Sequence, residues 1–338
     1  MSPPEQMSRT SPIEEAHFVC RLPGESKVRM YREALSEDVA DARLVYRGFQ
    51  QRGIELPVRQ TDECIQELSE QHSLSVAPIV RCMGREEYLK TVSWLIDSLK
   101  SSGSLEKVVF SRVHREERSP NYRPHDHFEA LCAHFPEQAV HWIRWKGVGE
   151  WIGSSPELLL KKVDDRFETV ALAGTLHSDQ DEWGVKEQQE QASVARFIEC
   201  ELKRVGVELE SDGPREIKAG PVRHLKTNYL FESPLKADHF LGLLHPTPAV
   251  CGHPREEALD RLLKYETYER KFYTGYWGIE AEQSQYFVNL RCLSVHDRQL
   301  MFYAGGGLNR RSDPEKEWRE TEEKMKATMS FLHETEHG

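Results

Sequence analysis

The sequence predicts an α+β fold, and two observations support this prediction. Short apolar segments with the composition of β-strands are interleaved with longer segments in which apolar residues recur at helical spacing. The two kinds of segment do not alternate as regular β-α-β units, as they would in a parallel α/β fold. We therefore expect mixed β-sheets with helices packed on them. The 338 residues are enough for one large domain or two ordinary ones.

The first part of the chain, up to residue 82, is mixed and charged, with one amphipathic helix expected at 61–72. No internal repeat or long linker separates this part from the rest. We expect residues 1–12 to be disordered, because they are polar and rich in proline and serine. Residues 13–82 are expected to form the N-terminal part of the same fold as the main domain, 83–334.

Helical periodicity and capping residues define the helices of the main domain. The segment 85–99 carries apolar residues at helical intervals and ends at a Ser/Gly-rich break. The last helix begins at Ser312-Asp313-Pro314-Glu315, a capping-box pattern with proline in the first turn. Two further helices are expected at 126–135 and 187–202. Strands are expected from Lys107 onward and at 141–145, 158–160, 167–172, 286–290 and 300–303.

The composition favours a small-molecule partner and a reducing compartment. The net charge of -11, without any basic cluster, argues against nucleic-acid binding. Seven scattered cysteines without a CxxC pair predict free thiols, and neither a disulfide framework nor a zinc site. The sequence shows no signal-peptide core and no apolar stretch of membrane-spanning length, so we expect a cytoplasmic protein without membrane contact.

Two helices carry carboxylates at positions that are ambiguous. On the apolar face of the helix 187–202, one turn back from Val194 lies Glu190, which continues the buried stripe. The alternative is a frayed first turn with Glu190 in water, and periodicity alone leaves both open. In the last helix, Glu317, Glu320 and Lys324 share one face, a pattern that usually marks a solvated, salt-bridged helix.

Two further features are equally ambiguous by themselves. Lys107 stands directly before the apolar run Val108-Val109-Phe110, and a single lysine there usually extends to solvent from the end of a buried strand. The cluster Gly305-Gly306-Gly307 follows a strand and precedes the turn that begins the last helix. Its N–H groups could bind an anion, although the cluster matches neither a P-loop nor a dinucleotide-binding fingerprint.

Taken in order, many short strings of this chain resemble those of the chorismate-utilising enzymes, the family of isochorismate, anthranilate, aminodeoxychorismate and salicylate synthases. They lie between Lys107 and Lys326 and include KVVFSR, WIGSSPELL, ALAGT, VRHLKT, LHPTPAV, ERKFYTG, YAGGGL and SDPEKEWRETEEK. The resemblance implies the family's four-layer α/β/β/α fold, in which two mixed β-sheets pack face to face with helices outside. It also makes 83–334 the chorismate-binding catalytic domain.

The resemblance implies a base, an acid and a metal site. Lys107 matches the general base that activates water, and Glu157 matches the acid that protonates the departing hydroxyl group. Mg2+ is the implied cofactor, with Glu190 and Glu320 as its ligands and Glu317 as a ligand through water. A hard cation that keeps several waters needs only one or two protein carboxylates, which fits this set.

The resemblance also implies how chorismate, a dianion, is bound by an acidic protein. The enolpyruvyl carboxylate is expected to meet a planar arginine fork and a lysine, while Mg2+ takes the ring carboxylate. The implied groups for the enolpyruvyl carboxylate are Tyr273, Arg291, Lys324 and the amide of Gly305. Gly174 and Thr175 match positions at the ring end of the pocket, and His245 in the LHPTPAV loop is a further substrate-binding residue.

The implied reaction adds water at C2 while hydroxide leaves C4, so one group must take a proton and another must give one. Lys107 can be the base only in its neutral form, which burial beside apolar neighbours favours. Glu157 must be held protonated by an apolar or anionic setting. We expect the two side chains on opposite sides of the substrate ring.

The lysine at position 107 indicates which reaction the chain performs. Members that use ammonia typically have glutamine there, and aminodeoxychorismate synthases have a nucleophilic lysine where this chain has Ala173. The string LHPTPAV is typical of isochorismate synthases. We therefore expect an isochorismate synthase, an isomerase that acts without a glutaminase subunit and, like the family, as a monomer. Its product would serve menaquinone or siderophore biosynthesis.

Two alternatives remain. A bifunctional salicylate synthase is one, because Gln191, Leu176 and the Tyr276-Trp277 pair depart from the usual family residues and could reshape the pocket. The other is a catalytically silent chorismate-binding protein. The simultaneous presence of a base, an acid, metal carboxylates and an anion clamp argues against this second alternative.

Overall fold

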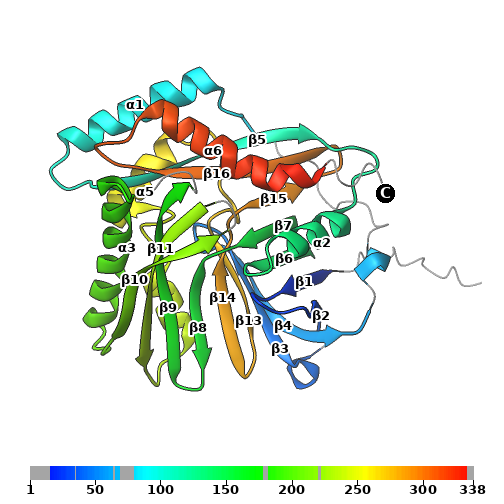
Figure 1. Ribbon diagram of the computed structural model, residues 1–338. Helices are drawn as coiled ribbons and strands as arrows, with labels where there is room; N and C mark the ends of the chain where they lie inside the picture. Colours follow the sequence, from blue (N-terminus) through cyan, green and yellow to red (C-terminus); the bar gives the residue numbers. More distant parts are fainter. Residues whose placement is uncertain are drawn as a thin grey trace, which may run out of the picture.

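The computed structural model describes residues 16–34, 36–63, 65–68, 80–177, 182–219 and 222–332 (Figure 1). The helices in these ranges are α1 (Arg85–Ser101), α2 (Pro124–His134), α3 (Val185–Arg204), α4 (Ala237–Leu244), α5 (Arg255–Tyr265) and α6 (Pro314–Met329), with short 3-10 helices η1 (Glu37–Val39), η2 (Ile65–Leu68) and η3 (Ser330–Leu332). The strands are β1 (His17–Arg21), β2 (Arg29–Glu33), β3 (Ala42–Arg47), β4 (Gly53–Thr61), β5 (Lys107–Glu117), β6 (Ala139–Trp145), β7 (Gly149–Ser155), β8 (Leu158–Val163), β9 (Arg166–His177), β10 (Glu210–Ala219), β11 (Val222–Glu232), β12 (Gly252–His253), β13 (Tyr276–Glu280), β14 (Gln283–Val288), β15 (Cys292–Val295) and β16 (Gln299–Leu308). The predicted α+β class is confirmed, and the predicted disordered segment 1–12 lies outside the described residues.

The sixteen strands form one sheet in the order β10-β11-β9-β8-β14-β13-β3-β4-β2-β1-β6-β7-β15-β16-β5-β12. Every pairing among the described strands is antiparallel, so the prediction of mixed sheets is wrong. Two strands can pair in parallel only if a long crossover, usually a helix, connects them and they then lie side by side in the sheet. Here α2 lies between β5 and β6 in the chain, but β7, β15 and β16 separate those strands in the sheet. Similarly, β11 separates β9 from β10.

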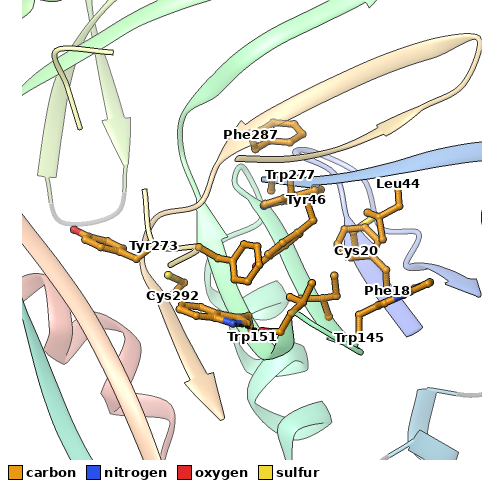
Figure 2. Packing of buried hydrophobic residues seen from close by; sticks show 14 of the residues in the cluster. Phe18, Cys20, Leu44, Tyr46, Trp145, Trp151, Tyr273, Trp277, Phe287 and Cys292 are labelled. Atoms are coloured by element: carbon orange, nitrogen blue, oxygen red, sulfur yellow. Dashed lines mark hydrogen bonds between the residues drawn. The ribbon is translucent and has the colours of Figure 1, made fainter. Parts of the chain in front are cut away.

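The two packed sheets that the family resemblance implied correspond to two halves of this single curved sheet. The hydroxyl of Tyr46 on β3 lies 3.0 Å from Nε2 of His141 on β6, although three strands separate β3 from β6 in the sheet. Trp277 on β13 contacts both Phe18 and His141, with ring centroids 5.4 and 5.0 Å away. Figure 2 shows the apolar layer that these contacts belong to. The sheet therefore curls until its halves face each other across an aromatic core.

The helices cover the outer faces of both halves (Figure 1). On one half, α3 packs against β9 and β11 and α4 packs against β8. On the other half, α1, α5 and α6 pack against β5 or β16, and α2 packs against β6 and β7. Strands β1 to β4, from the charged first part of the chain, belong to the same sheet. No helix in the described ranges is both long and apolar enough to cross a bilayer.

Local sequence patterns predicted helix and strand positions correctly, except where pairing between distant strands decided the structure. The predicted start of α6 is confirmed, since Oδ1 of Asp313 accepts a hydrogen bond from the backbone N–H of Lys316 at 2.9 Å. The predicted helix 61–72 is wrong at its beginning, because Thr61 ends β4 and pairs with Met30 of β2. Of the rest of that segment, the structure describes only η2 and its neighbours 62–63. The glycine cluster lies inside β16, paired with β5, instead of leading into a turn.

The aromatic core should dominate stability. Trp277 is fully buried between the two halves, so we expect Trp277→Ala to lower the free energy of unfolding by about 3 to 5 kcal/mol. Urea denaturation would measure the loss. Trp94 is 44% exposed, and for Trp94→Ala we expect a loss below about 1 kcal/mol. Equal losses in the two variants would contradict a core centred on Trp277.

Candidate active site

One cavity forms where the two ends of the curled sheet approach each other. Strands β9 and β11 contribute to its wall from one end of the sheet, and β5 and β16 contribute from the other. Helices α3 and α6 and the segments that flank β13 and β14 complete it. Nine of the twelve predicted site residues line this cavity: Lys107, Glu157, Gly174, Glu190, Tyr273, Arg291, Gly305, Glu320 and Lys324.

Lys107 is the first residue of β5, and it is buried in the cavity wall instead of extending to solvent. Its side chain is 7% exposed, and its Nζ lies 3.9 Å from Oε1 of Glu190 on α3. A glycine on the neighbouring strand makes this approach possible. A Cβ on Gly307 would lie 2.6 Å from Cε of Lys107 and 2.7 Å from Oε1 of Glu190. Any side chain at Gly307 would therefore push the lysine and the carboxylate apart.

Glu157 lies between β7 and β8 and is buried. Burial disfavours its charged form and raises the pKa of its carboxyl group to about 8, although Lys107 acts in the opposite direction. Ser155 supports its backbone, because Oγ of Ser155 accepts a hydrogen bond from the N–H of Glu157 at 3.2 Å. At neutral pH this carboxyl group is therefore mostly protonated and can donate a proton.

Cationic and phenolic groups gather on another part of the wall. Arg291, between β14 and β15, has a positive φ of 43°, and its burial lowers the pKa of its guanidinium. Lys324 on α6 donates hydrogen bonds to the carbonyl oxygen of Gly305 at 2.9 Å and to Oε1 of Glu320 at 2.7 Å. Tyr273 stacks on Tyr303 with ring centroids 5.5 Å apart, and Figure 2 shows its hydroxyl pointing away from the aromatic core. This arrangement suits a carboxylate ligand.

Three carboxylates, those of Glu190, Glu317 and Glu320, form what we call the acidic cluster between α3 and α6. Burial alone would raise the pKa of Glu320, but the ammonium groups of Lys324 and Lys186 outweigh it and lower this pKa to about 2. Burial raises the pKa of Glu317, which is 1% exposed. Its Oε2 is buried and has no hydrogen-bond partner in the described part of the chain.

The acidic cluster fits a magnesium ion in its chemistry. Carboxylate oxygens are the hard ligands that Mg2+ prefers, and the ion needs only one or two of them because it keeps its waters. Among the described residues the buried Oε2 of Glu317 has no hydrogen-bond partner, and a Cβ on Gly306 would lie 3.0 Å from that atom and 3.9 Å from Oε1 of Glu320. The glycine thus leaves space beside both oxygens. Within the described ranges, no three His, Cys, Asp or Glu side chains are grouped closely enough to hold a metal by themselves.

Two predicted residues, Glu317 and His245, are not among the residues that line the cavity. Glu317 lies behind the glycine cluster, and the side chain of Thr175 lies outside the described part of the structure. His245 is buried behind the wall, where its Nε2 donates to the carbonyl oxygen of Thr274 at 2.8 Å and its Nδ1 accepts from Gln51 at 2.7 Å. Burial lowers the pKa of His245 to about 4, which keeps the ring neutral. In this position it supports Thr274, which lines the cavity.

Two residues near the cavity were not predicted. His224 on β11 lines it and donates from Nδ1 to the carbonyl oxygen of Gly174 at 3.0 Å. Burial lowers the pKa of His224 to about 4, so its ring is neutral at physiological pH. Lys186 pairs with Glu317 across the acidic cluster. The string VRHLKT contains His224, and Lys186 stands one helical turn before Glu190, but neither signal indicates a role without the tertiary contacts.

Comparison with known proteins identifies one family. The family model described as "Chorismate binding enzyme" matches residues 50–333 of the chain. Among curated proteins, isochorismate synthase MenF of Escherichia coli (strain K12) is 31% identical over 215 residues, which are 60% of this chain and 48% of MenF. Isochorismate synthase EntC of the same organism is 27% identical over 251 residues, which are 70% of this chain and 64% of EntC. The chain thus spans between about half and two thirds of the length of these relatives.

Solved structures share the fold. The crystal structure of a protein described as a putative 2,3-dihydroxybenzoate-specific isochorismate synthase, DhbC from Bacillus anthracis, superposes with a TM-score of 0.78 at 22% identity, covering 95% of this chain and 96% of that one. The structure of Escherichia coli MenF gives a TM-score of 0.78 at 21% identity, covering 94% and 88%. These likenesses identify the fold of the chain.

The raised pKa of Glu157 predicts a pH dependence of stability. The folded protein holds this proton more tightly than the unfolded chain, so the stabilisation is present below about pH 4.5 and is lost as the pH rises to about 8. We expect the unfolding free energy of the wild type, relative to Glu157→Gln, to fall across this range by at most roughly 5 kcal/mol. Urea denaturation at a series of pH values would measure it. A difference that stays constant with pH would contradict the raised pKa.

Proposed function

The chain belongs to the family of chorismate-binding enzymes, and from this membership we propose that it is an isochorismate synthase, which isomerises chorismate to isochorismate with Mg2+. One observation carries the proposal. A buried lysine, Lys107, and a carboxyl group held protonated, Glu157, line the same cavity. These are a candidate base and a candidate acid for adding water to one carbon while a hydroxyl group leaves another. The curated relatives named above support the same assignment by their names.

In the proposed reaction Lys107 takes a proton from water as the oxygen attacks C2. The ring double bonds shift, and Glu157 gives its proton to the hydroxyl group that leaves C4, so atoms and charge balance over the step. The pKa of about 8 leaves Glu157 protonated at neutral pH, as a general acid requires. The position of Lys107 at the start of β5 holds its amine in the cavity wall, where its side chain is only 7% exposed.

The substrate's two carboxylates account for the remaining charged groups. We assign the enolpyruvyl carboxylate to Arg291, Tyr273, Lys324 and the backbone of Gly305. Glu190 and Glu320 would hold Mg2+ directly, with Glu317 contributing through water. When bound, the ion would supply the positive charge that the ring carboxylate needs. Gly174 and Thr175 belong to the ring end of the pocket, and His245 acts on the substrate through its support of Thr274.

The proposal makes water the nucleophile, and hence makes a glutaminase subunit unnecessary. By the family resemblance, Lys107 matches the position at which members that use ammonia typically carry glutamine. The product, isochorismate, is a precursor for either menaquinone or a siderophore, as the names of the relatives and structural matches also suggest. The proposed compartment is the cytoplasm, and the proposed state is a monomer.

The activity is tested directly. We expect purified protein with chorismate and Mg2+, and without ammonia or a glutaminase, to form isochorismate detectable by chromatography. Removal of Mg2+ with a chelator should abolish product formation. Release of pyruvate together with salicylate would identify the bifunctional alternative. Tight chorismate binding without any product would identify the catalytically silent protein.

The role of Lys107 is tested by Lys107→Gln. We expect kcat to fall at least a hundredfold, because the base that activates water is removed. Chorismate binding, measured by calorimetry, should persist. Lys100→Gln is a suitable control, because Lys100 is an exposed lysine on α1 and its loss should leave kcat unchanged. Wild-type turnover in Lys107→Gln would refute the assigned base.

A further inference from the structure

Lys186 connects the two helices that carry the acidic cluster. It lies on α3, one helical turn before Glu190, and its Nζ donates a hydrogen bond to Oε1 of Glu317 on α6 at 2.8 Å. The lysine side chain is 25% exposed and that of Glu317 is 1% exposed. Solvent therefore screens this ion pair little, and the loss of either partner would leave a nearly buried charge uncompensated.

Each carboxylate of the acidic cluster has a lysine side chain beside it. The nearest N–O distances are 2.7 Å for Lys324 and Glu320, 3.9 Å for Lys107 and Glu190, and 2.8 Å for Lys186 and Glu317. Lys107 and Lys324 also line the cavity and can act on the substrate, whereas Lys186 is not among the lining residues. The charge of Lys186 therefore acts on the acidic cluster alone.

We propose that Lys186 is a built-in counter-cation that sets the affinity of the acidic cluster for Mg2+, an inference that rests on the proposed magnesium site. Its ammonium group already occupies one oxygen of Glu317. Lys107 and Lys324 line the cavity and can turn to the substrate, which leaves Glu190 and Glu320 to the ion, whereas Lys186 stays on Glu317 and keeps it neutralised. The same ion pair keeps Glu317 compensated while no metal is bound.

This role predicts two effects of removing the charge, and a lysine with a purely structural role would produce only one of them. Without the ammonium group, Mg2+ no longer meets a repelling positive charge, so its affinity should rise. Without the same group, the metal-free protein holds a buried carboxylate without a partner, so its stability should fall. A lysine that only joins α3 to α6 would lower stability without tightening Mg2+ binding.

The test is Lys186→Met, which keeps an unbranched apolar side chain and removes the charge. We expect isothermal titration calorimetry with Mg2+ alone to show at least tenfold tighter binding than in the wild type. The melting temperature without metal should fall, and added Mg2+ should raise it by more than it raises that of the wild type. Lys186→Arg, which retains the charge, should behave like the wild type. Lys203→Met is the matched control, since Lys203 lies on the same helix 3.8 Å from Glu199 but is 67% exposed.

Equal or weaker Mg2+ binding in folded Lys186→Met would overturn the proposal. If that variant does not fold, the double variant Lys186→Met/Glu317→Gln removes both members of the ion pair. We expect it to recover folding and to bind Mg2+ within about threefold of the wild type. A double variant that also fails to fold, or that loses Mg2+ binding, would contradict a role confined to charge balance.

The experiment separates this inference from the proposed function. Wild-type protein that binds Mg2+ but forms no isochorismate would refute the proposed activity and leave the role of Lys186 intact. Wild-type protein that forms isochorismate while Lys186→Met shows unchanged Mg2+ affinity would refute only the role of Lys186. Wild-type protein that binds no Mg2+ would overturn the role of Lys186 together with the magnesium site.

Discussion

The curl of a single antiparallel sheet is the constraint on which the rest of the molecule depends. Its aromatic core, with Trp277 in contact with Phe18 and His141, holds the two halves face to face. Because the halves are fixed in this way, β9 and β11 from one end of the sheet meet β5 and β16 from the other around one cavity. The absence of a side chain at Gly307 then allows Lys107 and Glu190 to approach each other across the wall.

Burial and the choice of charged partners give similar side chains of this cavity different properties. Burial raises the pKa of Glu157 to about 8, and the charge of Lys107 is the one effect that acts against this rise. Glu320 is paired directly with Lys324, and its pKa falls to about 2. Two carboxyl groups of one cavity thus differ in protonation at neutral pH. This separation suits one of them to donate a proton and the other to bind a cation.

Local patterns in the sequence predicted much of the fold, and they failed where pairing is non-local. Helical spacing predicted α1 and α3, and α6 begins within the predicted 312–315 pattern, although its capping residue is Asp313. The helix predicted at 61–72 begins with a strand residue because β2 and β3 flank β4 in the sheet. His245 was expected to bind the substrate, yet its ring nitrogens bond to Thr274 and Gln51 behind the wall.

The sequence by itself determined the chemical groups and their order: a lysine before an apolar run, a glutamate in the string WIGSSPELL, and carboxylates on two helices. These identities were enough to recognise the family. Only the tertiary structure decided which of these groups meet and in what protonation state. Protonation depends on burial and on distances between residues far apart in the chain. For this reason Glu157 could be named from sequence, while its raised pKa and the pairing of Glu317 with Lys186 required the fold.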